Sequence, residues 1–282
     1  MRYDITVKDL SAAVTVEKYI RKALPALTDS SIREAFARRD VKIDGLRVPK
    51  GTPVHNGSAI TLYAAQAAGQ RLCVVYEDEH VLLVNKPRGI SVHGDEGFGA
   101  TVLELAQAYL HSESVCLCHR LDNQTSGLLL LAKDADSEKL IRSAFAHRNA
   151  NKTYLCLARG PFSTPEAEKR DYLRKDALAG RVSIFPREVS GAVPIITRYR
   201  VLENGEVSRV RISLITGRTH QIRAHLAYLG HPVLGDDVYG DRLWNKQNSA
   251  RSLMLCAVEL SLCPGGHLRY LDDRVFKIPE PF

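Results

Sequence analysis

The stretch His119-Arg120-Leu121-Asp122-Asn123-Gln124-Thr125-Ser126-Gly127 decides the organisation of this chain, because it carries a charged, polar segment directly into the apolar residues 128–132. Those residues, four leucines and an alanine, predict a strand that is buried on both faces. Gly127 suits a bend before the strand, and the two hydroxyl residues preceding it can bond nearby backbone. We therefore expect the Asp122 carboxylate to be held rigidly beside the core. An aspartate in this setting can also serve only to stabilise a turn, so its role depends on the rest of the chain.

The composition is that of a globular protein with an anionic partner. The chain has 282 residues, of which 45% are apolar and 25% charged, enough for one large domain and a small one. The net charge of +7 favours nucleic acid as the leading candidate partner. No secretory signal is present, and no apolar run approaches the ~20 residues of a membrane span. We expect a cytoplasmic protein that binds no membrane.

The six cysteines lie mostly inside apolar runs and include no C-x-x-C pair, which indicates buried, reduced thiols. Cys116, Cys118 and His119 have the residue types of a metal site. Alternation along a strand would separate the histidine from both thiols, however, and no second ligand pair follows at zinc-site spacing. Neither a P-loop nor a G-x-G-x-x-G motif is present. We therefore expect neither a metal nor a cofactor.

Residues 1–63 predict a small domain of two helices and a hairpin. Apolar residues at helical spacing over 16–23 predict the first helix, and the capping-box pair Ser31 and Glu34 predicts the start of the second. Alternation then leads into an Asp44-Gly45 turn, and residues 60–63 predict a returning strand.

This first domain carries 11 basic and 7 acidic residues, an excess of +4. Its basic cluster consists of Arg38, Arg39 and Lys42. Such a cluster can neutralise RNA phosphates, although a solvated charged face is the alternative. Residues 64–70 lack periodicity and predict a linker, so a second domain is expected over 71–282.

In the second domain, the spacing of apolar residues predicts most helices and strands. Residues 169–191 lack this periodicity and are rich in charge, which predicts a surface excursion. The predicted elements are a hairpin over 73–84, helices over 101–109 and 134–147, and strands over 152–157, 196–202 and 207–215.

A second polar segment, residues 217–225, follows the last of these strands and opens a helix. Thr219 is expected to cap the start of this helix and Gly230 to end it. A helix start that combines several cations with free N–H groups favours anions.

Together these segments resemble the RluA-type family of pseudouridine synthases. The resemblance covers roughly residues 72–262, and residues 1–63 resemble the S4-like RNA-binding module. The segments that carry it are His119-Arg120-Leu121-Asp122 with Thr125-Ser126-Gly127, Lys152-x-Tyr154, Gly217 to Arg223, Asn85-Lys86-Pro87, Gly230-His231-Pro232, Gly235-Asp236 and Tyr239-Gly240. Two positions depart from the family pattern: Gly94, where proline is usual, and Cys256, where histidine is frequent.

The resemblance implies isomerisation of uridine within RNA: the N1-glycosidic bond breaks, the uracil turns, and it rejoins through C5. It implies that Asp122 is the nucleophile, that Tyr154 lies over the uracil as a candidate for proton transfer at C5, and that Arg223 pairs with Asp122. These residue types suit the chemistry, because a carboxylate attacks an anomeric carbon only when ionised, and a neighbouring guanidinium favours that form. A base in folded RNA must also be extruded to be reached.

We therefore expect an α+β protein in which a small S4-like α/β domain precedes a catalytic domain with a mixed, largely antiparallel sheet flanked by helices and loops. The expected partner is RNA, with ribosomal RNA ahead of transfer RNA, and the chain is expected to act as a monomer. The residues predicted to contact RNA are Arg120, Lys86, Arg218, His220, Arg38, Arg39 and Lys42.

Two other functions stay open at this point. A noncatalytic RNA-binding or ribosome-assembly factor could retain the synthase fold, but the presence of Asp122, Tyr154 and Arg223 argues against it. A hydrolase using Asp122 would need a second carboxylate or a Ser–His set at a recognisable spacing, and G-x-S-x-G is absent. His119, His220 and His225 invite a general-base or metal role, but no carboxylate–histidine set with ligand spacing accompanies them.

Overall fold

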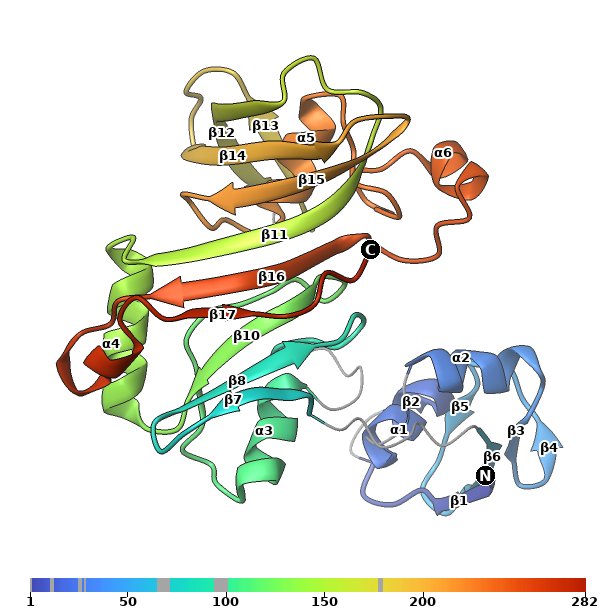
Figure 1. The fold of residues 1–282 in the computed structure, drawn as a ribbon. Coiled ribbons are helices and arrows are strands. Elements are labelled where there is room, and N and C mark those ends of the chain that lie inside the picture. Colours follow the sequence, from blue (N-terminus) through green and yellow to red (C-terminus); the bar gives the residue numbers. More distant parts are fainter. Residues whose placement is uncertain are drawn as a thin grey trace. The chain divides into compact units, whose positions relative to one another are not determined.

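The computed structural model contains two compact units, which are described separately (Figure 1). The N-terminal unit comprises Met1–Leu72 and Ile90–Glu113, and the main unit comprises Cys73–Gly89 and Ser114–Phe282. The structure describes residues 2–10, 13–24, 27, 29–64, 72–93, 101–176 and 180–282. The predicted linker beyond Ala64 and the departure at Gly94 lie outside the described residues.

The N-terminal unit is built on an antiparallel sheet of strand order β1-β6-β3-β4, and a short separate ladder joins β2 to β5. Its core packs helix residues such as Ile20 and Ile32 with the strand residues Val41 and Leu62. Its elements are β1 (Arg2–Thr6), β2 (Val14–Thr15), α1 (Val16–Ala23), α2 (Asp29–Ala37), β3 (Val41–Ile43), β4 (Leu46–Arg47), β5 (Pro53–Val54), β6 (Ala59–Tyr63) and α3 (Val102–Leu110).

Both helices predicted for residues 1–63 are present, but the predicted start of α2 is wrong. The helix begins at Asp29, so Ser31 lies inside its first turn and cannot be the cap. The Asp44-Gly45 turn is present, with positive φ at both residues, as a tight hairpin requires. The strand returning from this turn is the short β4, whereas the predicted strand over 60–63 pairs with the other edge of β3.

The main unit contains one large sheet of strand order β13-β12-β14-β15-β11-β16-β10-β8-β7, with β17 added to β16 and β9 to β10. The pair β10–β16 is parallel and the other pairs described are antiparallel, which confirms the predicted mixed, largely antiparallel α+β architecture. Its elements are β7 (Val74–Glu77), β8 (Val81–Lys86), β9 (Cys116–Leu117), β10 (Ser126–Ala132), α4 (Ala135–Ala146), β11 (Ala150–Arg159), β12 (Glu166–Asp176), β13 (Arg181–Phe185), β14 (Val193–Glu203), β15 (Val207–Leu214), α5 (Gln221–Tyr228), α6 (Arg242–Gln247), β16 (Leu255–Leu262), the 3-10 helix η1 (Gly266–Leu271) and β17 (Val275–Lys277).

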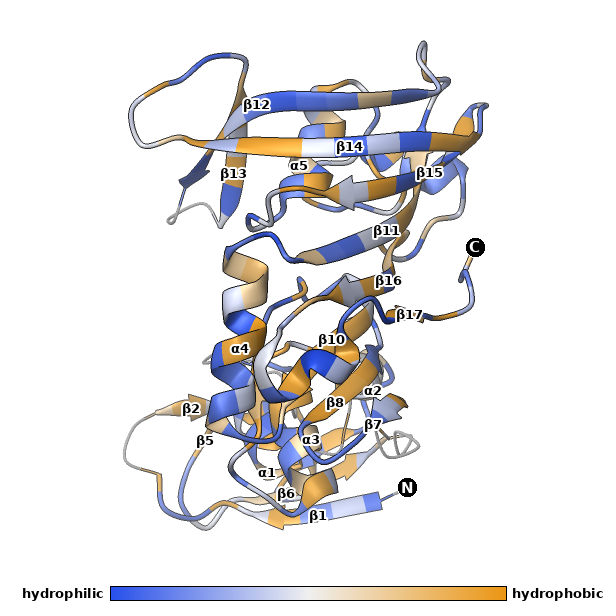
Figure 2. Ribbon diagram, turned by 60° about the vertical axis from the view of Figure 1, so that its left-hand side comes forward, coloured by the Kyte–Doolittle hydropathy of each residue, from blue (hydrophilic) through white to orange (hydrophobic). Residues whose placement is uncertain are grey.

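Strand β10 is the leucine-rich strand predicted from the sequence, and it is buried from Gly127 to Ala132. Figure 2 shows its neighbour β8 as predominantly apolar as well. Gly127 lies within this strand, at its start, and not in a turn before it. Its φ is +110°, and a Cβ here would lie 2.2 Å from the backbone oxygen of Ala257 on β16. Glycine is therefore required for the parallel strands to approach each other.

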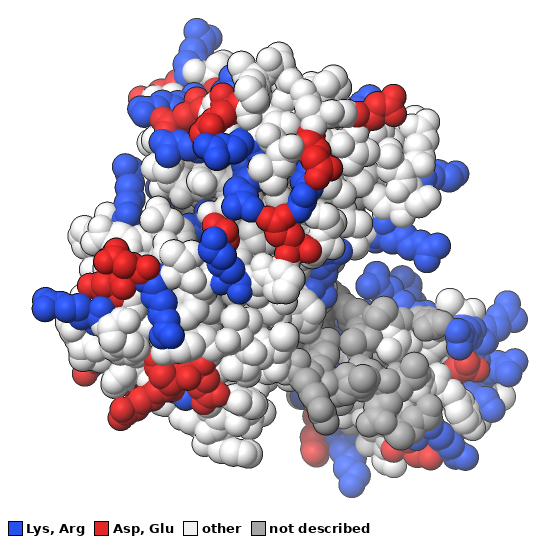
Figure 3. Space-filling view, in the orientation of Figure 1, with Lys and Arg blue, Asp and Glu red and all other residues white. Residues whose placement is uncertain are grey.

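The predicted surface excursion over 169–191 is wrong, because β12 and β13 form an antiparallel hairpin there. Strand β12 is predominantly polar (Figure 2), and most of its side chains are exposed or half-buried. Glu166 and Glu168 of β12 pair across the strands with Arg200 and Arg198 of β14, and Figure 3 shows acidic and basic side chains intermixed over this region. A strand that is stabilised by charged pairs with its neighbour lacks the apolar alternation by which a strand is predicted from sequence.

Two helices pack on the sheet of the main unit at positions that matter for function. Helix α4, capped by Asp134, contacts β10 and β16, and α5 contacts β13 and β14 (Figure 1). The loop that leads into β10, the middle of β11 and the first turn of α5 consequently line one pocket. Among the described residues, no helix has the length and apolar character needed to cross a membrane.

Candidate active site

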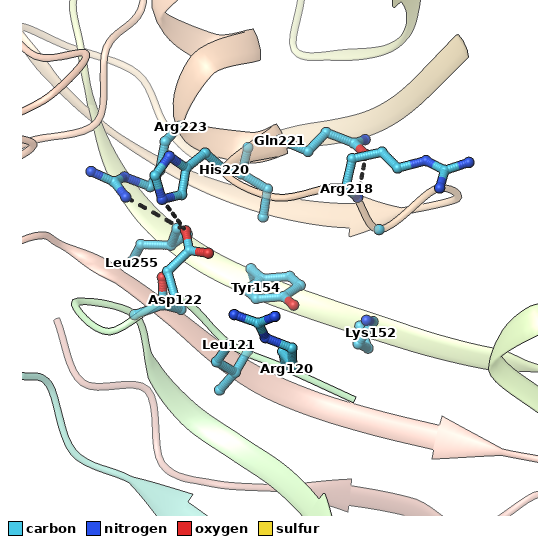
Figure 4. Close-up of a pocket in the computed structure, with 13 residues that line it drawn as sticks. Arg120, Leu121, Asp122, Lys152, Tyr154, Arg218, His220, Gln221, Arg223 and Leu255 are labelled. Carbon is cyan, nitrogen blue, oxygen red and sulfur yellow. Dashed lines mark hydrogen bonds and ion pairs between the residues drawn. The ribbon is translucent and has the colours of Figure 1, made fainter. Parts of the chain in front are cut away.

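The pocket joins the three segments that the sequence singled out, and Figure 4 shows Arg223 and His220 directed towards Asp122, with Tyr154 beside it. Asp122 comes from the loop before β10, Tyr154 and Lys152 from β11, and Arg223 from α5. The lining residues are Arg120, Leu121, Asp122, Thr125, Lys152, Tyr154, Gly217, Arg218, His220, Gln221, Ile222, Arg223 and Leu255.

The loop that carries Asp122 is anchored on both sides of the carboxylate. Before it, the Nε2 atom of His119 accepts a hydrogen bond from the Leu130 N–H at 3.0 Å. Burial, assisted by the nearby Lys152 ammonium, holds the pKa of His119 well below its ordinary value, so the ring stays neutral and can accept that bond. After it, the Asn123 carbonyl accepts the Gly89 N–H at 2.9 Å. These anchors, more than the hydroxyl groups of the turn, fix the position of Asp122.

Lys86 is a third anchor, and its predicted contact with RNA is wrong. Its side chain is only 1% exposed, and its Nζ atom donates to the carbonyls of Pro87 and Asn123, each at 2.9 Å. Burial lowers the pKa of Lys86 to about 7, and the negative charge of Asp122 opposes that change. Lys86 therefore supports the Asp122 loop from beneath and cannot reach a phosphate in solvent.

This depressed pKa predicts a specific pH dependence of stability. Between pH 7 and the ordinary lysine value, the unfolded chain binds a proton that the folded chain does not, so the free energy of unfolding must rise with pH over that window. Relative to Lys86→Met, the wild-type protein should gain a few kcal/mol between pH 7 and pH 10, because one pKa unit corresponds to about 1.4 kcal/mol. Urea denaturation at several pH values measures the difference, with the exposed Lys277→Met as the control. Parallel profiles for wild type and Lys86→Met would contradict the burial of the charge.

Arg223 is held by a buried carboxylate while it faces Asp122. Its Nε and Nη2 atoms donate to the two oxygens of Asp236 at 2.7 and 2.9 Å, and both side chains are at most 4% exposed. Its remaining nitrogen, Nη1, lies 3.5 Å from Oδ2 of Asp122. Burial alone would lower the pKa of Arg223, but the bond to Asp236 and the charges of Asp236 and Asp122 raise it, so the guanidinium stays charged.

His220 borders the same carboxylate and has an unusual backbone. Its φ is +55° at the start of α5, and its side chain does not cap the helix. The Nδ1 atom lies 2.9 Å from the Tyr239 hydroxyl, and Nε2 lies 3.9 Å from Oδ2 of Asp122. Burial, together with the charge of Arg223, lowers the pKa of His220 despite the opposing influence of Asp122, so the ring is neutral at neutral pH.

The first turn of α5 is fixed by Gln221 and not by the predicted cap Thr219. The Gln221 amide oxygen accepts from the Arg218 N–H at 3.1 Å and from the Thr216 hydroxyl at 2.9 Å, and its Nε2 donates to Thr197. His225 continues this network one turn later. It lies 2.9 Å from both Thr197 and Asp171, at hydrogen-bond distance and fully buried, so it supports the helix and cannot act on substrate.

Tyr154 is buried in the pocket wall, where a register shift in the β11–β16 ladder separates it from Thr153. The extra residue at this shift is Val258 of β16, and Tyr154 keeps its regular pairing with Ile212 of β15. Burial, and then the negative charge of Asp122, raise the pKa of Tyr154 well above its ordinary value, so the phenol keeps its proton. The side chain thus offers an aromatic surface and a neutral O–H group.

The predicted RNA contacts fall into two sets. Arg120, Arg218 and His220 line the pocket together with Asp122, and both arginines are exposed. In the N-terminal unit, Arg38 and Arg39 are exposed at the end of α2, and Lys42 lies half-buried on β3.

Sequence reasoning named the segment Gly235-Asp236 but gave Asp236 no role, although it is the direct partner of Arg223. It also overlooked Gln221, whose polar contacts organise the turn before Arg223. The available signal was an acidic residue soon after an arginine that is expected in a cleft, because a buried guanidinium needs a carboxylate.

Comparison with known proteins agrees with this fold. Residues 80–228 match the family model described as RNA pseudouridylate synthase. Ribosomal large subunit pseudouridine synthase C of Vibrio cholerae is 30% identical over 257 residues, covering 84% of this chain and 80% of that protein. The protein of the same name from Escherichia coli K12 is 31% identical over 254 residues, covering 84% and 79%.

Solved structures give the same result. Human RNA Pseudouridylate Synthase Domain Containing 1 superposes with a TM-score of 0.61 at 27% identity, covering 76% of this chain and 85% of that one. Human RNA Pseudouridylate Synthase Domain Containing 4 shares the fold, with a TM-score of 0.60 at 24% identity, covering 74% and 88%.

The chain belongs to the RNA pseudouridylate synthase family. It is an RNA pseudouridine synthase of the RluA type, an enzyme that isomerises uridine in RNA to pseudouridine.

Proposed function

We propose that this enzyme modifies uridines of ribosomal RNA of the large subunit, with Asp122 as the nucleophile. The assignment of Asp122 rests on the position of its carboxylate, which lies 3.5 Å from the buried Arg223 cation. The pocket that holds both side chains also has exposed arginines among its lining residues. The choice of RNA is supported by the similar proteins, which are named ribosomal large subunit pseudouridine synthases.

In the proposed reaction, a carboxylate oxygen of Asp122 bonds to C1′ of the extruded nucleotide as the N1–C1′ bond breaks and its electron pair passes to the uracil. The uracil then turns, C5 bonds to C1′, and the Asp122 carboxylate leaves. The proton on C5 is lost and N1 gains one, so the product is an isomer of the substrate. The Arg223 guanidinium faces the Asp122 carboxylate at 3.5 Å, and Asp236 keeps the guanidinium in place.

Tyr154 is proposed to hold the uracil by contact with its ring. Its raised pKa makes the phenol a weak acid, and a neutral phenol oxygen is a poor base. This favours a packing and hydrogen-bonding role over removal of the C5 proton, for which Tyr154 was the expected candidate.

The substrate is tested by mapping pseudouridine in ribosomal and transfer RNA from a strain that lacks the gene, complemented with wild type or with Asp122→Asn. We expect pseudouridine to be missing at one or more positions of ribosomal RNA in this strain, and to be restored by the wild-type gene but not by Asp122→Asn. Loss confined to transfer RNA would overturn the choice of RNA but not the chemistry. Sedimentation of the free enzyme and of its RNA complex tests the proposed monomer.

We propose that residues 1–63 form an S4-like module that adds affinity for RNA, whereas the pocket of the main unit performs catalysis. Its excess charge and the cluster of Arg38, Arg39 and Lys42 support this role. Each cation that neutralises a phosphate steepens the salt dependence of binding.

Replacing Arg38, Arg39 and Lys42 by glutamine in the full chain should weaken binding of long RNA. The slope of log Kd against log salt should fall by ~2 to 3, whereas single-turnover conversion at saturating RNA should stay near the wild-type rate. Arg170, Lys139 and Lys277, which are exposed cations of the main unit, provide a matched triple replacement. An equal loss of slope in both triple variants would show that net charge matters and the cluster does not.

A further inference from the structure

Lys152 is a cation in the pocket that has no part in the roles proposed for Asp122, Tyr154 and Arg223. It lies on β11 two residues before Tyr154, so the two side chains emerge on the same face of the strand. In the view of Figure 4, Tyr154 lies between Asp122 on one side and Lys152 on the other. The Nζ atom lies 5.0 Å from the centre of the Phe145 ring, and only 3.4 Å from the position that a Cβ on residue 217 would occupy. This is an ordinary van der Waals distance, and it places the ammonium beside the turn that leads into α5.

Lys152 faces the Phe145 ring but has no carboxylate partner among the described residues. None of the carboxylates in the described part of the chain lies within ion-pair distance of its Nζ atom, in contrast to Lys133 and Lys277, which pair with glutamates. Burial lowers the pKa of Lys152, and no neighbouring group offsets this effect. An ammonium held in this way gains most from an anion that enters the pocket.

The reaction generates such an anion. When the N1–C1′ bond breaks heterolytically, the electron pair stays on the uracil and the negative charge spreads over N1, O2, C5 and O4. At the same time the electron-deficient C1′ is taken by the Asp122 carboxylate. Charge that develops during bond breaking is best stabilised by a preorganised group in a site from which water is largely excluded.

We propose that Lys152 contacts the uracil in the pocket and stabilises the anion that forms as the glycosidic bond breaks. This inference rests on the proposed function of Asp122, because it places the ribose at the Asp122 end of the pocket and the departing base towards Lys152. Lysine suits the task for a physical reason. The uracil must turn before it rejoins through C5, and a point charge with three rotatable donors on a flexible stem can follow O2 or O4, whereas the fixed fork of arginine cannot.

The test compares Lys152→Met and Lys152→Arg with wild type under single-turnover conditions at saturating RNA. Lys152→Met should slow the conversion about 10²-fold, the loss typical of removing one oxyanion donor, with the Kd for RNA within a few fold of wild type. Lys152→Arg should retain part of the rate. Lys152→Met should be at least as stable as wild type in thermal unfolding, since it removes a desolvated cation that has no carboxylate partner and keeps an apolar side chain beside Phe145.

A modified substrate isolates the leaving group. RNA with 5-fluorouridine at the target position carries a base whose anion is stabilised by the fluorine, so breakage of its N1–C1′ bond should depend less on Lys152. We expect the loss caused by Lys152→Met to shrink at least tenfold with this RNA, measured as disappearance of N-linked 5-fluorouridine. Lys277→Met, which removes an exposed lysine from β17, should behave as wild type with both RNAs.

Three outcomes overturn the inference. An equal loss with both RNAs makes Lys152 a positioning residue. A Kd raised more than tenfold with an unchanged rate makes it a phosphate contact. If Lys152→Met converts RNA at the wild-type rate while Asp122→Asn is inactive in the same assay, the role of Lys152 is rejected and that of Asp122 stands. If Asp122→Asn is active, the proposed role of Asp122 is itself rejected.

Discussion

Asp122→Asn should reduce pseudouridine formation by on the order of 10⁴-fold or more, as loss of a nucleophile commonly does. The amide keeps the size of the carboxylate and can still accept a hydrogen bond, but it cannot form the bond to C1′. Because the loop is anchored by His119, Lys86 and Gly89, its backbone should not change. The variant should therefore bind RNA within a few fold of wild type, because it loses one negative charge and no phosphate contact.

The measurement is single-turnover conversion by enzyme purified from a host without an active copy, so that trace wild type does not mask the loss. Asp122→Glu serves as the matched control, because it keeps the charge but moves it by one methylene group. Activity above background in the asparagine variant, or a Kd raised a hundredfold, would be incompatible with a purely chemical role for Asp122.

The sequence predicts the fold best where burial decides the structure. The leucines of β10 have no alternative to a buried strand, and α4 follows from its apolar spacing and its Asp134 cap. By contrast, β12 was missed because its stability depends on cross-strand pairs, Glu166–Arg200 among them, that exist only once the sheet has formed.

The site shows the same division. Asp122, Tyr154 and Arg223 stand in motifs, and the structure gathers them in one pocket. The burial of Lys86 could not be foreseen, because a lysine in an Asn-Lys-Pro-Arg segment has the sequence pattern of an exposed turn. One of its acceptors, the Asn123 carbonyl, lies 37 positions away in the sequence and meets Lys86 only in the folded chain. The clamp of Asp236 on Arg223 likewise depends on how α5 meets the segment that follows it.

The two bonds from Arg223 to Asp236 should matter for both stability and activity. Asp236→Asn should lower the free energy of unfolding by about 3–5 kcal/mol, because it leaves the buried Arg223 charge without its bidentate partner. The freed guanidinium is no longer held at its distance from Asp122, so single-turnover activity should fall about 10²-fold even where the variant is fully folded.

The double variant Arg223→Met/Asp236→Asn separates stability from activity. It removes both charges, and the asparagine oxygen can still accept the N–H groups of Val238 and Tyr239 that now bond Asp236. Most of the lost stability should return, since apolar replacement of a buried pair is often neutral, whereas activity should stay low because the Arg223 guanidinium beside Asp122 is gone. Recovery of activity along with stability would show that Arg223 acts only as a support.

The pH dependence of the single variant provides an independent check on the same pair. Burial alone would raise the pKa of Asp236, but the bonds from Arg223 and from two backbone N–H groups outweigh it and hold the pKa below its ordinary value. The folded chain therefore binds fewer protons than the unfolded chain between that depressed pKa and the ordinary one. The advantage of wild type over Asp236→Asn should be complete above about pH 4 and should decline as the pH falls through the depressed pKa. Urea denaturation between pH 7 and pH 3 measures this decline, and a difference that stays constant to pH 3 would place the stabilising charge on a group other than Asp236.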